Sequence, residues 1–472
     1  MDRYPIQDSK KECCCILPRG QRVSTTGINC RHIKYSYLKV DYLYHQWSKF
    51  RSRGGVIVTK GYVEFFFSNA KFRRLWAASV ISLLGEWFNT IALFFLILEY
   101  SGSEFLLGVL FSVRMALFAL SQPINGLLAD RMSRKKLMLW ANIFQVFLAL
   151  SFLFVDGKED MWWLIAMSGL MMLLHGVYVT AERAALPNIV DEDDLITANA
   201  IDSASWSTAL CLGAMLGGII VSIFGTDLAF IIDSYTFLLS SLLLIPLTFE
   251  QKYDESVRGP LIKTAISNIK IGWTRIYHDK KLLRIVFAKS SWNLAGAGLA
   301  GVFLVLAGGK LTGYGAAFGF GLFFFARGIG TGIGPLIARA VFKDRTKWPS
   351  LIGILVSISG FFYFLLGITL EIYLPLTVAL IILAHSASGG NWVLSTVLTQ
   401  MWVEDEVRGR VFSIDMLILG GTAAFSTSIA GYLVEYQNLS LQTGFIAFSF
   451  IMIMCGMVFT YWRPDIDSVI EQ

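Results

Sequence analysis

The stretch Gly126-Leu-Leu-Ala-Asp130-Arg131-Met-Ser-Arg134-Lys135-Lys136 lies between two long apolar runs of the chain. Five of its eleven residues are charged, and they stand where one apolar run ends and the next begins. Such a stretch is typical of a tight, charged loop between two membrane helices. The succession of apolar runs and charged loops on either side of this stretch decides the predicted fold.

The composition favours a membrane protein. Of the 472 residues, 55% are hydrophobic and only 16% are charged, whereas a soluble protein carries about 25% charged residues. The apolar residues gather in runs of about 20, the length of a membrane-spanning helix. They do not form the alternating segments of about ten residues that build a transmembrane barrel. The sequence therefore predicts an all-α polytopic membrane protein.

Twelve apolar runs are long enough to span a bilayer. We expect them at about 75–99, 105–129, 137–155, 161–181, 201–224, 227–249, 283–308, 314–338, 350–370, 373–398, 411–434 and 444–462. In the wide gap between the sixth and seventh, Leu261, Ala265, Ile269 and Trp273 recur at helical spacing, which predicts an amphipathic helix on the membrane surface. The predicted parts are a basic extension (1–70), a six-helix bundle (71–249), this connector (250–282), a second six-helix bundle (283–463) and a short tail (464–472).

The extension and the loops indicate how the chain lies in the membrane. Residues 1–70 hold twelve Lys and Arg against five Asp and Glu, which fits either a cytoplasmic tail or an organelle-targeting segment. With the N-terminus inside, the inner loops and the tail carry twenty Lys and Arg, and the outer loops carry two. This bias predicts both termini on the cytoplasmic side, or on the stromal or matrix side in an organelle.

The two halves match each other at one constant offset of 213 residues. The matching pairs are Arg114 with Arg327, Val190-Asp-Glu-Asp with Val403-Glu-Asp-Glu, Ile201-Asp202 with Ile414-Asp415, and Gly218 with Gly431. Four sites in one ungapped register predict parallel repeats related by an axis along the membrane normal, with a site at their interface.

No pattern in the sequence indicates an enzyme, a cofactor or a metal site. The P-loop signature is absent, and the six cysteines have neither disulfide nor zinc spacing. The net charge of +6 follows the loops rather than a nucleic-acid-binding face. We expect no nucleic-acid partner, a lipid bilayer around the chain, and a monomer.

Two of these stretches resemble the major facilitator superfamily, over about residues 72–463. The 126–136 loop is similar to its signature G-x-L-A-D-R-x-G-R-K, with Ser133 in place of the second glycine. Gly213-Ala-Met-Leu-Gly217-Gly218 is similar to the antiporter motif G-P-x-x-G-G, with Ala214 in place of proline. Residues 185–199 and 400–411 resemble the macrolide-efflux and enterobactin-exporter branch, of the drug:proton antiporter type, in which a relative of similar pattern moves lysophospholipids.

The resemblance implies a gating role for the loop. Gly126, Arg131 and Lys135 belong to the motif, and Asp130 would sit against the start of span eleven, where free N–H groups favour an anion. Arg134 would pair with Glu182 at the end of span four. Further gating candidates just before and just after the start of span eleven are Arg408, Gly409, Arg410 and Asp415. The competing reading is that the basic residues only anchor the topology, which leaves Asp130 unexplained.

Ionisable residues inside spans are costly and are functional candidates. The substrate or proton candidates are Glu86, Arg114, Asp233, Lys289 and Arg327. Glu86 and Asp233 are candidate proton carriers, with a structural pair between Glu86 and Arg114 or Arg327 as the alternative. Lys289 lies near the inner end of span seven, where it would snorkel to the interface. His175 and His385 are interpreted as core residues.

The leading functional prediction is a secondary transporter that works by alternating access and exports an amphipathic small molecule in exchange for protons. One alternative is a transporter of lysophospholipid or another lipid that needs no proton. The other is a membrane scaffold of the same fold that transports nothing.

Overall fold

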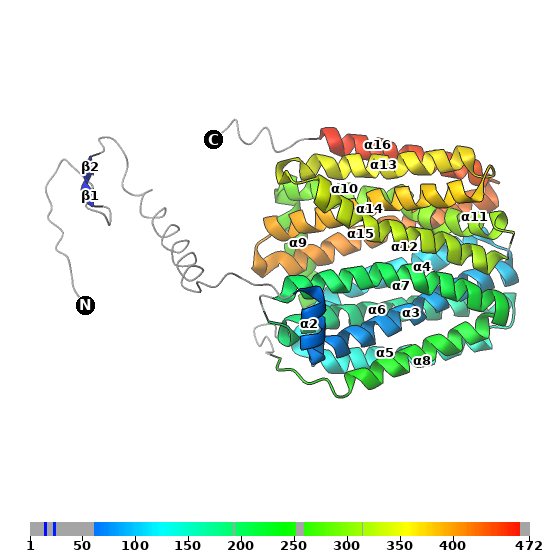
Figure 1. Ribbon diagram of the computed structural model, residues 1–472, viewed down its shortest axis with the longest axis horizontal. Helices are drawn as coiled ribbons and strands as arrows, with labels where there is room; N and C mark the ends of the chain where they lie inside the picture. The colour runs from blue at the N-terminus through cyan, green and yellow to red at the C-terminus, as the bar shows by residue number, and fades with distance from the viewer. Residues whose placement is uncertain are drawn as a thin grey trace. The chain divides into compact units, whose positions relative to one another are not determined.

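A computed structural model describes residues 14–16, 22–24, 61–191, 194–251, 259–313 and 315–462. Within these ranges, 12 helices are long and apolar enough to cross a membrane, which confirms the predicted fold class (Figure 1). The predicted tail 464–472 and most of the extension 1–70 lie outside the described residues. Two short strands within that extension, β1 (Cys14–Ile16) and β2 (Arg22–Ser24), pair antiparallel with Cys14 opposite Ser24.

Each half of the helical part contributes six spans, some of them extended by short π or 3-10 turns. The first six are α3 (Ala70–Leu96) with η1 (Ile97–Ser101), α4 (Glu104–Arg131), α5 (Arg134–Ser151) with η2 (Phe152–Phe154), η3 (Lys158–Asp160) with α6 (Met161–Ile189), α7 (Leu195–Phe224) and α8 (Thr226–Leu244). The second six are α10 (Lys280–Gly298) with η5 (Leu299–Phe303) and α11 (Leu304–Leu311), α12 (Ala316–Val341), η6 (Arg345–Lys347) with α13 (Trp348–Thr369), α14 (Leu374–Trp402), α15 (Asp405–Tyr436) and α16 (Leu441–Tyr461). Each half is preceded by one further helix: α2 (Tyr62–Ser68) comes before the first half, and α9 (Leu261–His278) comes before the second.

Several spans extend beyond the apolar runs that predicted them. α7 begins at Leu195 and α15 at Asp405, about six residues before the predicted starts. Hydropathy marks the part of a helix inside the hydrocarbon, whereas a polar first turn can project beyond it. Polar caps fix other ends: the Ser103 side chain accepts a hydrogen bond from the Leu106 N–H at α4, and Asp279 caps α10 in the same way.

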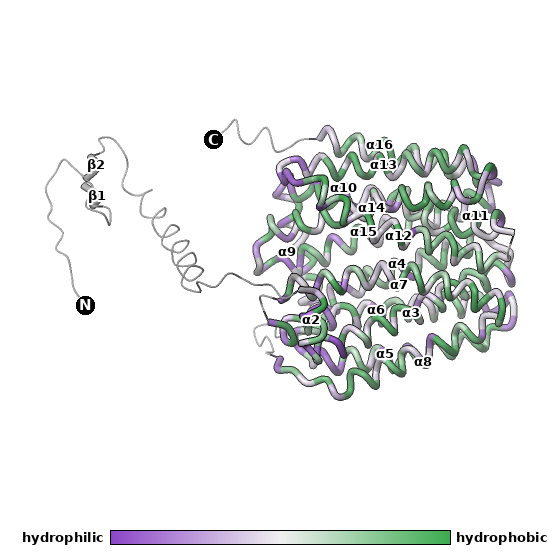
Figure 2. The backbone as a smooth tube through the Cα atoms, viewed as in Figure 1, coloured by the Kyte–Doolittle hydropathy of each residue, from purple (hydrophilic) through white to green (hydrophobic). Residues whose placement is uncertain are grey.

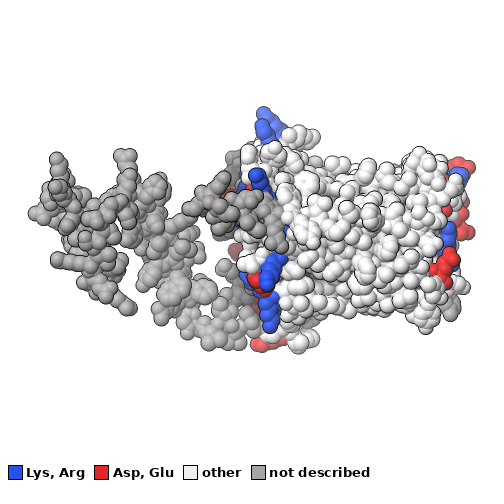
Figure 3. Space-filling view, turned by 90° about the horizontal axis from the view of Figure 1, so that it is seen from above, with Lys and Arg blue, Asp and Glu red and all other residues white. Residues whose placement is uncertain are grey.

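Large apolar side chains cover the outside of the helical part. Phe147 is 64% exposed, Leu336 is 68% exposed and Phe450 is 58% exposed. The middle lengths of the helices are largely hydrophobic (Figure 2), and on the face seen in Figure 3 the charged side chains gather at the two ends of the helices. An apolar belt of this extent suits the hydrocarbon of a bilayer rather than water.

The two bundles meet along α4 against α15 and α7 against α12. Glycines bring these backbones close together. A Cβ on Gly108 of α4 would lie 2.5 Å from the Thr427 carbonyl oxygen of α15, and a Cβ on Gly218 of α7 would lie 3.0 Å from the Gly321 Cα of α12. Small residues at helix contacts are typical of membrane proteins, where packing replaces the hydrophobic effect.

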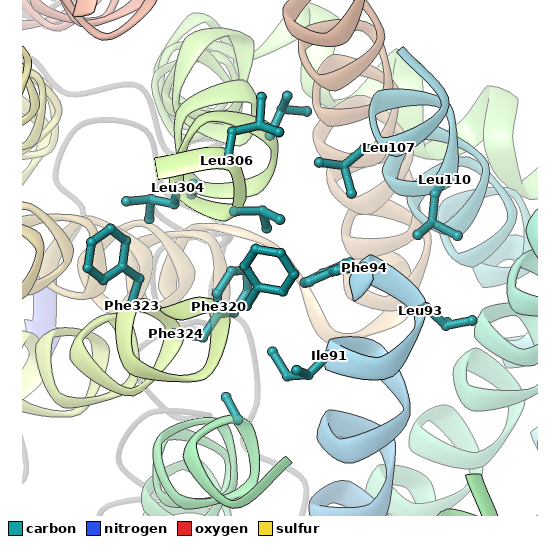
Figure 4. Packing of buried hydrophobic residues seen from close by; sticks show 14 of the residues in the cluster. Ile91, Leu93, Phe94, Leu107, Leu110, Leu304, Leu306, Phe320, Phe323 and Phe324 are labelled. Carbon is teal, nitrogen blue, oxygen red and sulfur yellow. The ribbon is translucent and has the colours of Figure 1, made fainter. Parts of the chain in front are cut away.

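The apolar core joins the bundles at one end of the molecule. We call the end at which α3 begins and α16 ends the α9 end, because α9 lies there (Figure 1), and the opposite end the far end. One apolar cluster fills the far end and includes Phe94 and Leu107 of the first bundle with Leu304 and Phe324 of the second (Figure 4).

At the α9 end, each apolar cluster draws its buried members from one side of the interface. One cluster takes them from residues 65–247, a second from residues 285–398, and a third from α9 and the second bundle at residues 276–414. In the described chain, the continuous apolar seal between the bundles therefore lies at the far end.

Candidate functional site

Ionisable side chains of the first bundle meet halfway along their helices. Glu86 lies 16 residues after the start of its span at Ala70 and 15 before its end at Ser101, so it is near the middle of the membrane at about 1.5 Å per residue. Its Oε1 is 3.9 Å from Arg114 Nη2, and its Oε2 is 3.0 Å from His175 Nδ1. α3, α4 and α6 each supply one member of this group.

Asp233 of α8 is the fourth member. It is 0% exposed, and it interacts electrostatically with both Glu86 and Arg114. α3 approaches α8 closely at Gly85, where a Cβ would lie 2.6 Å from Asp233 Oδ1. Neither oxygen of the Asp233 carboxylate accepts a hydrogen bond from the described residues, although the Asn89 side chain lies beside the carboxylate. We call Glu86, Arg114, His175 and Asp233 the first-bundle cluster.

The charge balance of this cluster suits the binding of a proton. Two carboxylates share one permanent cation, so with both ionised one negative charge lacks a counter-ion. A buried charge of this kind is costly, and a proton on either carboxylate or on His175 removes the imbalance. The side chains of Glu86 and His175 keep 15% and 16% of their surface accessible, so they are not sealed on every side.

The sequence did not single out His175, which was interpreted as a core residue. It lies 17 residues after the start of its span at Lys158 and 14 before its end at Ile189, at the same depth as Glu86. The equal depth of Glu86 and His175 in their spans is the signal that could have suggested their contact.

The second bundle buries an ion pair of its own. Lys289 Nζ lies 2.7 Å from Asp415 Oδ2, and the two side chains are 3% and 2% exposed. The ammonium also lies 4.0 Å from the ring centroid of Trp392. The interpretation of Lys289 as a snorkelling residue is therefore wrong: the Asp415 carboxylate offsets the cost of burying the ammonium, so the side chain has no need to reach the interface.

Arg327 of α12 lies at mid-depth in the second bundle, eleven residues after Ala316 and fourteen before Val341. Its guanidinium lies 5.3 Å from the ring centroid of Phe324. It also interacts electrostatically with Tyr363 and His385, whose Oη and Nε2 atoms are 2.7 Å apart. Its predicted alternative partner, Glu86, lies instead with Arg114.

The charged loop joins α4 to α5 at the α9 end. Asp130 Oδ1 is 4.0 Å from Arg134 Nη2, and Arg131 donates a hydrogen bond of 2.8 Å to the Gly259 carbonyl just before α9. Lys135 donates to the Ile245 carbonyl after α8. Ser133 has a φ of −61° and caps α5, so the position of the family's second glycine does not adopt the left-handed conformation here.

Arg134 reaches the end of α6 through the Ala184 carbonyl oxygen at 2.8 Å and Asn188 Oδ1 at 2.6 Å, so these contacts are to an amide and a carbonyl rather than to the expected acid. Glu182, the expected partner of Arg134, lines a small pocket with Trp76, Arg183 and Asp202 among others.

The span-five glycines lie against neighbouring helices on two sides. A Cβ on Gly213 would lie 2.9 Å from the Trp87 Cβ, and one on Gly217 would lie 2.9 Å from the Phe88 Cα, both on α3. Gly218 faces α12 in the other bundle. Gly126 of the loop has open space where a Cβ would stand. The glycine motif is thus a packing site between three helices.

The start of α15 is joined to α9. Arg275 of α9 donates to Glu404 at 3.0 Å and to the Trp402 carbonyl at 3.2 Å. The hydrogen bond from Arg275 to the Glu404 carboxylate lowers the pKa of Glu404 below its ordinary value. Gly272 of α9 packs on the Arg410 backbone, where a Cβ would lie 2.5 Å from its carbonyl oxygen. Sequence reasoning missed this contact, because the partners lie 129 residues apart.

The predicted residues at the start of α15 lie beside this junction. Arg408 donates to the Val403 carbonyl at 3.0 Å, and Gly409 has open space where a Cβ would stand.

Comparison with known proteins gives the same assignment as the fold. The family model described as Major Facilitator Superfamily matches residues 75–376. A Bacillus subtilis (strain 168) protein named "Putative bacilysin exporter BacE" is 24% identical over 350 residues, which cover 71% of this chain and 80% of that protein. The "Uncharacterized MFS-type transporter YfiS" of the same organism is 26% identical over 204 residues, 42% of this chain, and the match spans only 47% of that relative.

Solved structures share the architecture at low sequence identity. The crystal structure of the nucleoside transporter NupG matches with a TM-score of 0.62 and 14% identity, over 82% of this chain and 98% of that one. A POT family transporter in complex with 5-aminolevulinic acid matches with a TM-score of 0.64 and 12% identity, over 84% and 97%. At these identities the likeness shows the fold alone. The chain therefore belongs to the Major Facilitator Superfamily and is an integral, multi-pass secondary transporter rather than an enzyme.

Proposed function

We propose that this protein exports an amphipathic small molecule in exchange for protons. The observation that carries the proposal is the first-bundle cluster, in which two carboxylates at mid-membrane share one guanidinium. The likeness to a protein named as an exporter and the antiporter-like glycines of α7 support the direction. The protein works as a monomer in this proposal, with the branch of macrolide and enterobactin exporters as its nearest functional relatives.

Glu86 is the proposed proton carrier. With Glu86 ionised, its two oxygens face Arg114 at 3.9 Å and His175 at 3.0 Å. When Glu86 takes up a proton, both attractions weaken and Arg114 balances Asp233 instead. The cluster then holds equal positive and negative charge within the bundle. This redistribution is the event that would favour one arrangement of the bundles over the other.

The α9 end is proposed to face the cytoplasm, or the stroma or matrix. The twenty-to-two bias of Lys and Arg supports this orientation. The apolar seal at the far end then closes the outer side, and substrate would approach from within. The loop around Asp130, with Arg131, Arg134 and Lys135, is proposed as the inner latch that forms when the α9 end closes.

The test is transport in proteoliposomes with and without an imposed pH gradient. The probes are a dansyl amphipath and a fluorescent lysophosphatidylcholine. Wild-type protein should move the dansyl amphipath faster with the gradient, and Glu86→Gln should abolish this gradient-driven flux while sparing counterflow exchange. Glu99→Gln is the matched control, because Glu99 is an exposed acid at the end of the same span.

Equal flux with and without the gradient contradicts proton coupling. Gradient-driven flux that survives Glu86→Gln makes Glu86 structural. Gradient-independent movement of the lysolipid alone supports the lipid transporter instead, and movement of neither probe by any variant supports the scaffold.

A further inference from the structure

The two arginines at the same repeat position have different surroundings. Arg114 pairs with Glu86 at 3.9 Å and interacts with Asp233. At the constant offset of 213, Arg114 corresponds to Arg327, but Glu86 corresponds to Leu299 and Asp233 to Ile446. The second bundle has therefore kept the cation and holds apolar residues at the positions of both acids.

Arg327 has no counter-ion among the residues that the structure describes. Among the residues that the structure describes, no carboxylate lies within 4.0 Å of its guanidinium, and its Nε has no hydrogen-bond partner. The buried acid of the second bundle, Asp415, is paired with Lys289. Tyr363 and His385 face Arg327, but neither residue type is an anion near neutral pH.

A cation held at mid-membrane without an anion is unfavourable. A guanidinium presents a planar fork of donors that matches carboxylate and phosphate groups, so the missing partner is an oxyanion. No described carboxylate lies within 4.0 Å of the guanidinium, and Asp415 is paired with Lys289. The oxyanion would therefore come from a bound molecule.

The place of Arg327 agrees with a substrate site between the bundles. It lies one turn from Phe324 toward the α9 end, with its guanidinium 5.3 Å from that ring. The ring centroids of Phe324 and Trp87 are 5.8 Å apart, and Trp87 is the residue of the first bundle that follows Glu86. Phe324 belongs to the apolar seal (Figure 4). A molecule that enters from the α9 end would meet the guanidinium at the edge of that seal.

We infer that Arg327 receives an anionic head group, a carboxylate, sulfonate or phosphate, of the exported amphipath, with the apolar part of the substrate against Phe324 and Trp87. This inference rests on the proposed function and adds the charge class of its substrate. It also separates the roles of the two arginines: Arg114 serves the proton-binding cluster, and Arg327 serves the substrate.

Binding of three matched probes to the purified full chain tests the assignment. The probes are N-dansyl-ε-aminocaproic acid, its uncharged methyl ester, and cationic dansylcadaverine, and binding is followed by energy transfer from tryptophan in the absence of a pH gradient. Wild-type protein should bind the acid at least about tenfold more tightly than the ester, which corresponds to about 1.4 kcal/mol. Dansylcadaverine should bind most weakly.

The variants separate Arg327 from general charge effects. Arg327→Met should bind acid and ester equally, and Arg327→Lys should keep part of the preference, because lysine retains the charge but not the planar fork. Arg339→Met, which removes an exposed arginine from the last turn of the same helix, should leave the preference unchanged. Size-exclusion chromatography and circular dichroism establish that each variant is folded.

A wild-type protein without preference for the acid overturns the inference, including one that binds none of the probes, as does a preference that survives Arg327→Met. Since no gradient is present, a failure of proton coupling leaves this result unchanged. Conversely, the loss of anion preference leaves the effect of Glu86→Gln on gradient-driven flux untouched, so the two proposals fail separately.

Discussion

Replacement of Lys289 by methionine should destabilise the protein by about 3–5 kcal/mol, the usual cost of stranding one partner of a buried ion pair. Lys289 Nζ lies 2.7 Å from Asp415 Oδ2, and the side chains are 3% and 2% exposed. Asp415 Oδ1 already lacks a hydrogen-bond partner, so the substitution would leave both carboxylate oxygens unpaired. The ammonium also lies 4.0 Å from the Trp392 ring centroid, and the loss of that contact places the expected cost toward the upper part of the range.

The assay is reversible unfolding in mixed micelles, followed by tryptophan fluorescence. The double variant Lys289→Met with Asp415→Leu should recover most of the lost stability, because two apolar side chains replace a buried pair at little net cost. Lys310→Met, at an exposed lysine of the far end, should change the free energy of unfolding by less than about 0.5 kcal/mol. A loss below about 1 kcal/mol for the single variant, or a double variant as unstable as the single one, would refute the reasoning.

Three other perturbations test the packing, the α9 contact and the loop. In the same unfolding assay, Gly218→Leu should destabilise by about 1–3 kcal/mol, because a Cβ there would lie 2.7 Å from a backbone carbonyl oxygen of α12. Gly409→Ala, which has open space around it, should be neutral or stabilising by up to about 1 kcal/mol, and equal costs at the two glycines would contradict the packing argument. The Arg275–Glu404 pair should protect α9 from hydrogen exchange at pH values above the ordinary Glu pKa of 4.5. Because folding lowers the pKa of Glu404, this protection should decrease as the pH falls through the lowered pKa. Protection of α9 that does not change with pH would contradict the prediction. Asp130→Asn should reduce flux in proteoliposomes with membrane insertion intact, and unchanged flux would rule out the proposed latch.

The sequence was sufficient to predict where the spans lie, but it was insufficient to predict most of the side-chain contacts between them. Apolar length and the charge of loops are local properties, so all twelve spans could be predicted. Which side chains meet depends on how each helix is rotated and on which helix lies beside it, neither of which hydropathy contains. For this reason the sequence predicts Glu86 as an acid inside a span without its partner His175, and it predicts Lys289 at the interface rather than against Asp415.

The family motif shows a different limit. In the loop, Ser133 stands where the motif has its second glycine, a residue that tolerates a left-handed turn. Here the serine has a φ of −61°, and its side chain caps α5 by accepting a hydrogen bond from the Lys136 N–H. A short polar side chain that accepts a hydrogen bond from the first turn is as suitable there as a glycine. A departure from a motif can therefore preserve the helix start by a different interaction.

An anionic substrate changes the energetics of proton-coupled export. With the α9 end inside, a proton that moves inward and a monovalent anion that moves outward both carry charge in the direction favoured by an inside-negative potential. Each elementary charge contributes about 2.3 kcal/mol per 100 mV, so such a cycle gains about 4.6 kcal/mol per 100 mV, and a neutral substrate would gain half of that. A pairing of Glu86 for the proton with Arg327 for the anion thus makes export sensitive to the membrane potential as well as to pH. It also explains why one repeat position would be kept as arginine in both bundles while its acidic neighbours remain only in the first: two carboxylates beside Arg327 would compete with the anion that the second bundle has to bind.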